Sequence, residues 1–259
     1  MPNDRATLLA EFTTHFKASN VRRAANVRLA ASRLDGLVIP AKKQFSYNAV
    51  VGPRTAETGF HPALVIDQGK YVERPGGGVC QPSSTLYAAS LFSGLKAVER
   101  SNHSWQSPYI GPGLDAAVVW SNKDLVLRNP HPFDVRIRSI VAPDHITVQV
   151  LGNGVPGVYY DLQAEVERTF AFGTVETEAP RLSVGKRLLT ARGIDGLRLK
   201  RKRVVRSRNR VRRVERLSVD TYFPRQERYL VGTYVVTVSQ ALLSEGKPGL
   251  ESKQSKQSQ

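Results

Sequence analysis

The residues best suited to chemistry lie in one short segment that contains the only cysteine of the 259-residue chain. Three glycines at positions 76–78 precede Cys80. Glycine permits tight turns and close backbone contacts because it has no Cβ atom. Pro82 suits the first turn of a helix, and a mostly apolar run continues to Phe92. The pattern predicts a helix that begins near Cys80 and stops at Gly94.

A cysteine at a helix N-terminus has two interpretations. Free backbone N–H groups and the positive end of the helix dipole stabilise a thiolate, which is the nucleophilic form of the side chain. Alternatively, Cys80 is a small, inert core residue beside a glycine turn, as many free cysteines are. Under the first interpretation the helix is largely buried and its N-terminus faces a catalytic partner.

His103 and Asp115 are the candidate partners of Cys80. His103 lies in a predicted loop, and Asp115 follows a Gly-Pro-Gly turn twelve residues later. A cysteine, a histidine and an aspartate can act as nucleophile, base and orienting carboxylate. The order Cys–His–Asp also occurs in transglutaminase-like and other papain-related enzymes. Gln81, Gly78 and Trp105 are predicted to bind the oxyanion or the substrate.

Other roles for these residues remain open. His103 and Asp115 could bond only to nearby loop and turn groups. Cys80, His103 and Asp115 could instead hold zinc, but closely spaced ligand pairs such as HExxH are absent from the sequence. We therefore expect no metal and no cofactor.

The formal net charge of +16 is concentrated in residues 198–216, which carry eleven basic residues and one acidic residue. This block favours a polyanionic partner such as nucleic acid, anionic lipid or an acidic cell-wall polymer. The block contains no aromatic residue for base stacking, so nucleic acid is not the expected partner. A solvated hairpin with no partner is the alternative. The expected contacts are Arg206, Arg208, Arg210 and Arg212.

Hydrophobic periodicity predicts an α+β fold followed by a β-rich basic extension. We expect a helix from Ser19 or Asn20 to Leu34 and a hairpin of strands 135–137 and 146–150. Two long strands are predicted at 197–206 and 210–222. Shorter strands and loops are predicted at 37–40, 45–53, 63–66, 70–72, 116–120 and 125–127. The expected domains are residues 1–152 and 153–243, with a disordered tail at 244–259.

Composition also bears on the cellular compartment. No apolar run approaches the ~20 residues that span a bilayer, and the N-terminus lacks the charge pattern of a signal peptide. We expect either a cytoplasmic protein or a chain that lacks its export segment. A single cysteine excludes an internal disulfide framework.

A series of ordered motifs resembles the VanW-like family, which is named for an accessory protein of vancomycin-resistance clusters. The resemblance extends from about residue 12 to residue 150. The matching segments are Phe45-Ser46-Tyr47-Asn48, Val51-Gly52-Pro53-Arg54, Gly59-Phe60, Gly76-Gly77-Gly78-Val79-Cys80-Gln81, Thr85-Leu86-Tyr87, His103-Ser104, Gly113-Leu114-Asp115-Ala116, and Asp124-Leu125 with Arg128-Asn129.

The resemblance implies a cell-envelope protein, because the family is often membrane-anchored outside the cytoplasm. It also strengthens the candidacy of Cys80, His103 and Asp115, which are motif residues of the family. Residues 166–233 are similar to the β-rich G5 module, which is associated with cell-wall binding.

We therefore expect a cell-envelope protein that acts on peptidoglycan or binds it. If it acts on peptidoglycan, the expected mechanism is that of a Cys-His-Asp amidase, peptidase or transpeptidase. The alternative is a non-catalytic cell-wall-binding or scaffold module. The oligomeric state is not predicted.

Overall fold

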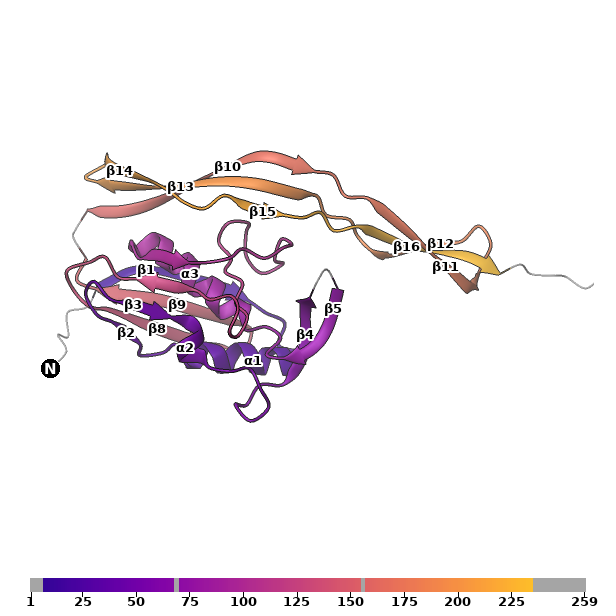
Figure 1. The fold of residues 1–259 in the computed structure, drawn as a ribbon, viewed down its shortest axis with the longest axis horizontal. Helices are drawn as coiled ribbons and strands as arrows, with labels where there is room; N and C mark the ends of the chain where they lie inside the picture. The colour runs from indigo at the N-terminus through magenta and orange to yellow at the C-terminus, as the bar shows by residue number, and fades with distance from the viewer. Residues whose placement is uncertain (1–6, 68–69, 155–156, 235–259) are drawn as a thin grey trace, which may run out of the picture. The chain divides into compact units, whose positions relative to one another are not determined.

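A computed structural model describes residues 7–67, 70–154 and 157–234 (Figure 1). The chain divides into two compact units, Met1–Phe172 with Ile194–Arg225, and Gly173–Gly193 with Gln226–Gln259. The predicted disordered tail, 244–259, lies outside the described residues. Strands predominate and three helices occur in the described part of the chain, in agreement with the α+β class.

The first unit is built on a four-stranded antiparallel sheet. Its strand order is β1 (Thr7–His15), β9 (His145–Gly152), β8 (Val135–Val141) and β2 (Val38–Ile39). The predicted hairpin of strands β8 and β9 is confirmed. Helix α3 (Cys80–Ser93) packs on β1 and β9, and helix α1 (Val21–Ser32) packs on β8 (Figure 1).

Helix α1 forms as predicted. The Asn20 side chain accepts a hydrogen bond from the Arg23 N–H at 3.4 Å and caps the first turn. Ala24, Val27 and Ala31 are fully buried on one face. This packing places Arg23 at the N-terminal end of the helix, close to the glycine segment.

Two smaller sheets complete the framework around α3. One contains β3 (Gln44–Ser46), β7 (Val126–Arg128) and β6 (Lys96–Glu99), and the other is the hairpin β4 (Pro62–Asp67) and β5 (Lys70–Pro75). The short helix α2 (Tyr47–Val51) follows β3, where the sequence predicted strands and loops. The Ser46 hydroxyl accepts the Ala49 N–H at 3.0 Å and caps this helix.

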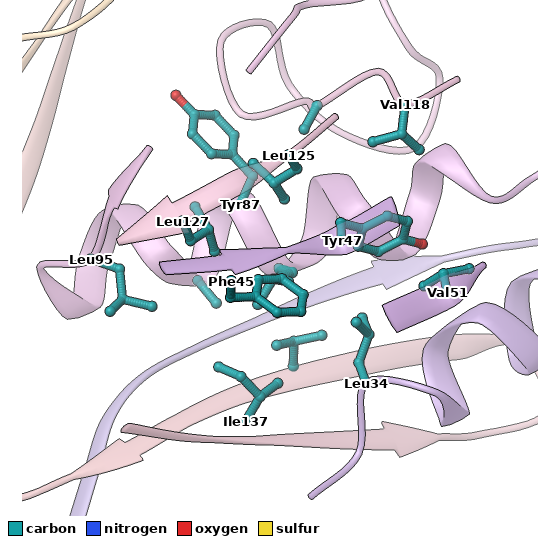
Figure 2. Packing of buried hydrophobic residues seen from close by; sticks show 14 of the residues in the cluster. Leu34, Phe45, Tyr47, Val51, Tyr87, Leu95, Val118, Leu125, Leu127 and Ile137 are labelled. Atoms are coloured by element: carbon teal, nitrogen blue, oxygen red, sulfur yellow. The ribbon is translucent and has the colours of Figure 1, made fainter. Parts of the chain in front are cut away.

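Helix α3 lies at the centre of the hydrophobic core. Figure 2 shows Tyr87 of this helix among side chains from α2, β3, β7 and β8. Helix α3 ends at Gly94, whose φ of +84° is the left-handed conformation that glycine favours. Residues on all sides of the helix are buried, so α3 is a rigid support for its first residue, Cys80.

Four later strands also belong to the first unit. They are β10 (Val158–Phe170), β13 (Gly196–Ser207), β14 (Arg210–Arg216) and β15 (Asp220–Tyr222), with β13 paired to each of the others. The two predicted long strands are present, but the second is interrupted after Arg216. Buried side chains of β13 and β15 pack against residues 87–115, which groups these strands with the first unit. The division into domains at residue 152 stays a prediction.

The second unit is a three-stranded sheet in which β16 (Glu227–Tyr234) lies between β11 (Thr174–Ser183) and β12 (Arg187–Ala191). Strand β16 runs parallel to β11 and antiparallel to β12.

One predicted strand, residues 116–120, is wrong. This segment forms only isolated bridges, Ala117 to Ser101 and Val119 to Lys123. The backbone of Ala116 bonds to side chains at the start of α3. The Ser83 hydroxyl donates to the Ala116 carbonyl at 2.7 Å, and the Ala116 N–H donates to the Ser84 hydroxyl at 3.0 Å. Over the residues that the structure describes, no helix has the length and apolarity needed to cross a membrane.

Candidate active site

The glycine triplet is required by close contacts on three sides. A Cβ atom at Gly76 would lie 2.6 Å from Cβ of Arg54, and one at Gly77 would lie 2.6 Å from the Ala63 carbonyl oxygen. At Gly78 it would lie 3.0 Å from Cγ of Arg23. The triplet thus brings two arginine side chains and strand β4 against the segment that leads into Cys80.

Cys80 is the first residue of α3 and is partly exposed. Its sulfur lies 3.4 Å from the Val118 carbonyl oxygen and 3.5 Å from the Val118 backbone nitrogen. The Val118 N–H and the helix N-terminus are both oriented to stabilise a thiolate.

His103 and Asp115 are brought together as the sequence predicted. His103 Nδ1 lies 2.7 Å from Asp115 Oδ2, and the His103 backbone N–H donates to the same oxygen at 2.7 Å. Because Asp115 engages Nδ1, Nε2 is the ring nitrogen available to Cys80, and the two side chains lie close enough to act on each other's ionisation. The structure therefore pairs the imidazole directly with the carboxylate and brings the ring beside the sulfur.

Asp115 is held by two further residues that the sequence analysis missed. Arg100 Nη2 lies 3.1 Å from Asp115 Oδ1, and the Tyr222 hydroxyl donates to the same oxygen. Tyr222 also accepts the Gly113 N–H at 2.7 Å. Arg100 in turn pairs with Asp220. No local motif marks these residues, because Tyr222 and Asp220 lie more than one hundred positions away in sequence.

Interactions among Cys80, His103 and Asp115 shift the pKa of each side chain toward its charged form. Burial alone would raise the pKa of the Cys80 thiol, but the hydrogen bond and positive charge of His103 hold that pKa below its ordinary value. Burial alone would lower the pKa of His103, whereas the hydrogen bonds with Asp115 and Cys80 raise it to about 9. Burial opposes ionisation of Asp115, yet His103 and Arg100 lower its pKa to about 2. His103 and Asp115 thus favour an imidazolium–carboxylate pair at neutral pH, and His103 shifts Cys80 toward the thiolate.

Cys80 and His103 line a cavity of about 600 Å³, large enough for a ligand of several residues. Its walls combine apolar side chains, including Val118 and Trp120, with cationic ones, including Arg23 and Arg54. Gly78 also lines this cavity, and its role in substrate binding stays a prediction. Trp105 is not one of the lining residues, and Trp120 supplies the indole ring instead.

The expected role of the Gln81 side chain as an oxyanion donor is not compatible with its position. Gln81 is completely buried, and its amide nitrogen donates to Thr14 Oγ1 at 3.1 Å and to His15 O at 2.9 Å. Its amide oxygen accepts a bond from Arg23 at 2.9 Å. Gln81 therefore fixes Arg23 and β1 relative to α3, and its side chain has no free amide hydrogen for substrate.

The zinc alternative is not supported by the arrangement of donors. Both oxygens of Asp115 already accept hydrogen bonds, and His103 lies between that carboxylate and the sulfur. Within the described ranges, three ligand atoms that lie within 4.8 Å of one another come from His15, Asp144 and His145, where β1 pairs with the start of β9.

The basic block is only partly available to a polyanion. Arg201 and Arg203 are buried, where they bond to Asp220 and Glu215 at 3.0 and 2.6 Å. Arg206 is half-buried and lies 3.8 Å from Asp161. The exposed basic residues include Arg208, Arg210 and Arg212 in the β13–β14 turn and the strand after it. Arg198, Lys200 and Lys202 on β13 are exposed as well, and the first two pair with Glu167. Arg201 and Arg203 thus have buried acidic partners, which a count of charged residues in the sequence could not reveal.

Comparison with known proteins gives matches to about half of the chain. It is 39% identical over 131 residues to the "Uncharacterized protein YoaR" of Bacillus subtilis, covering 51% of this chain and 43% of that protein. It is 29% identical over 142 residues to the "Vancomycin B-type resistance protein VanW" of Enterococcus faecalis, covering 53% of this chain and 52% of that protein. The chain thus spans about half the length of the curated relatives it matches.

A solved structure described as an IgA1 protease G5 domain covers 32% of this chain and 98% of its own length, with 19% identity and a TM-score of 0.22. A TM-score this low does not establish a shared fold, so the G5-like character of residues 166–233 stays a prediction. The model of the family described as VanW like protein matches residues 22–151, which ends one residue before the predicted domain boundary. Because this match covers half of the chain and contains all the motifs from Phe45 to Asn129, the chain belongs to the VanW-like family.

Proposed function

We propose that this chain is a cysteine-dependent acyl-transfer enzyme of the cell envelope that acts on amide bonds of peptidoglycan. The observation that carries the proposal is that Cys80, at a helix N-terminus, lines one cavity with His103, whose ring is bonded to Asp115. Nucleophile, base and orienting group in hydrogen-bond reach are the requirements for this chemistry.

In the first half of the reaction, the Cys80 thiolate attacks the amide carbonyl carbon and forms a C–S bond. The resulting oxyanion is placed next to the N-terminus of α3, where the Cys80 backbone N–H is the donor that can stabilise it, because the Gln81 N–H already bonds to the Gly78 carbonyl. The His103 imidazolium gives its Nε2 proton to the leaving amine as the C–N bond breaks. Asp115 keeps the ring oriented through the 2.7 Å bond to Nδ1. The product of this half is a thioester on Cys80 and a free amine.

In the second half, neutral His103 removes a proton from water or from an acceptor amine, which attacks the thioester carbonyl. The C–S bond breaks and the thiolate–imidazolium pair is restored. Water as acceptor gives an amidase or peptidase, and an amine gives a transpeptidase. The assignment to peptidoglycan rests on membership of a family that includes a protein named for vancomycin resistance.

The test is incubation of the purified protein with purified peptidoglycan, followed by mass spectrometry of released fragments and of intact protein. The wild type is expected to release or exchange amine-bearing fragments and to carry a transient acyl adduct on Cys80. Cys80→Ser is expected to abolish both, and Ser32→Ala, an exposed serine of α1 outside the cavity, serves as control. Release that persists undiminished in Cys80→Ser contradicts the proposal.

A non-catalytic wall-binding module is the second candidate, and the exposed arginines of the β13–β14 turn favour it. Exposed cationic side chains bind acidic polymers in a salt-sensitive way. The two functions are compatible within one chain, because the turn contributes no residue to the cavity of Cys80.

A further inference from the structure

The cavity of Cys80 contains two arginines that contact only neutral partners among the described residues. Arg23 donates to the Gln81 amide oxygen at 2.9 Å. Arg54 donates to the Gly52 carbonyl and to the Asn48 side-chain oxygen, each at 2.7 Å. A guanidinium carries five N–H donors, so both groups retain donors for a ligand.

Both guanidinium groups are partly withdrawn from water, and their burial lowers the pKa of each. Asp124 acts on Arg54 only from a distance, and its carboxylate is bonded to the Ser46 hydroxyl and the Asn48 N–H. Cys80 also acts favourably on both arginines from within the cavity, but no carboxylate contacts either guanidinium among the described residues. A half-buried cation of this kind is further stabilised by a ligand that supplies a contacting negative charge.

The two arginines are also held rigidly in place. The stem of Arg54 packs on Gly76 and its guanidinium lies 5.7 Å from the Trp120 ring centre. The stem of Arg23 packs on Gly78, and its guanidinium lies 5.8 Å from the ring centre of Tyr109. Fixed guanidinium groups bind carboxylates with little loss of side-chain entropy. The glycine triplet therefore leaves room for both arginine stems beside the segment that leads into Cys80.

We propose that Arg23 and Arg54 form a carboxylate subsite beside the Cys80 nucleophile, so that the enzyme selects an acyl donor with a free carboxylate near the amide it cleaves. The part of this proposal that concerns the cleaved amide rests on the proposed function. The binding of a carboxylate by the two arginines does not. In a peptide substrate the carboxylate would belong to the chain end or to an acidic side chain. The apolar wall at Val118 and Trp120 would contact the rest of the ligand.

The single cysteine allows a direct test with two alkylating reagents of similar size. Iodoacetate carries a carboxylate and iodoacetamide is its neutral counterpart. The ratio of their alkylation rates on the folded chain is compared with the ratio on the same chain unfolded in urea. We expect the folded ratio to favour iodoacetate by roughly tenfold or more, the effect of one charge-assisted hydrogen bond. Acetate is expected to protect Cys80.

Variants that remove one arginine charge show whether the preference for iodoacetate comes from the subsite or from the positive charge of His103. Arg23→Gln and Arg54→Gln are each expected to remove most of the preference for iodoacetate. Arg22→Gln makes the same charge change at the adjacent, exposed position of α1 and is expected to preserve it. Equal ratios in folded and unfolded wild type overturn the subsite, and so does a preference that survives in both cavity variants.

A second measurement does not depend on thiol reactivity. In Cys80→Ser, N-acetylalanine and its amide are titrated separately while the Nε–H signals of both cavity arginines are followed by NMR. Saturable shifts with the acid and none with the amide support the subsite, and no shift with either overturns it. If folded wild-type Cys80 resists both alkylating reagents while the acid still binds, the proposed function fails and the subsite stands.

Discussion

Replacement of Asp115 by asparagine is the sharpest perturbation of the candidate site. The change preserves shape but removes the negative charge that His103 Nδ1 contacts at 2.7 Å. The pKa of His103 is raised from 6.5 to about 9, which corresponds to about 3 kcal/mol of preference for the imidazolium. Among the interactions that raise the pKa of His103, the hydrogen bond with Asp115 contributes most, ahead of Cys80. We expect Asp115→Asn to remove roughly 1.5–3 kcal/mol of this preference, the range for a hydrogen bond to a charged group.

The assay is an NMR titration of the His103 ring protons in Cys80→Ser, with and without Asp115→Asn. The Cys80→Ser background removes the coupled thiol, so the difference between the two titrations isolates Asp115. We expect the pKa of His103 to fall by about 1–2 units in the double variant.

An exposed pair provides the control for stability. His145 Nδ1 and Asp144 Oδ1 are also 2.7 Å apart, but both side chains are at least 36% exposed. Asp144→Asn is expected to leave the urea midpoint unchanged, because exposed ion pairs contribute little. Asp115→Asn is expected to lower the midpoint, because it leaves Arg100 with less compensation in a buried network. An unchanged His103 titration in a folded Asp115→Asn variant would refute the reasoning.

Three further predictions follow from the same structure. Tyr222→Phe removes a hydroxyl that bonds both Asp115 and the Gly113 N–H, so we expect a loss of about 2–4 kcal/mol in the free energy of unfolding from urea titration, and a loss below 0.5 kcal/mol would contradict it. The raised pKa of His103 means that its stabilising contribution is complete below pH 6.5 and is lost as pH rises through about 9; the urea midpoint should therefore fall over this range more in wild type than in His103→Asn. Retention on purified cell wall should fall at high salt and after charge reversal of the exposed turn, and retention unaffected by both would remove the turn from the account; the residues to reverse are Arg208, Arg210 and Arg212.

The sequence predicted the parts of the fold that depend on local signals. Gly94 and Asn20 mark the ends of their helices by their own backbone or side-chain chemistry. The alternating residues of β8 and β9 identify a hairpin because one face of that sheet is buried. The glycines before Cys80 pointed to a close approach, but not to the arginines that lie against them.

The missed features depend on contacts that are distant in sequence. Residues 116–120 have strand-like composition, yet they form only isolated bridges, and the Ala116 backbone bonds to the hydroxyls of Ser83 and Ser84 in α3. The anchoring of Asp115 by Tyr222 depends on β15 meeting a loop from the other half of the chain. Arg201 was counted with the solvent-facing charge of the basic block, but it is buried against Asp220. Charge counting cannot distinguish such a structural cation from a binding one.

The central claim is that His103 makes Cys80 a nucleophile. The most direct test is the rate of alkylation of folded protein by iodoacetamide as a function of pH, in wild type and in His103→Ala. We predict that the wild-type rate rises at a pH below the ordinary thiol value of ~8.5 and that this step moves upward in His103→Ala. A step that is unchanged in His103→Ala contradicts the role of His103, and a thiol that reacts only after unfolding contradicts the nucleophile itself.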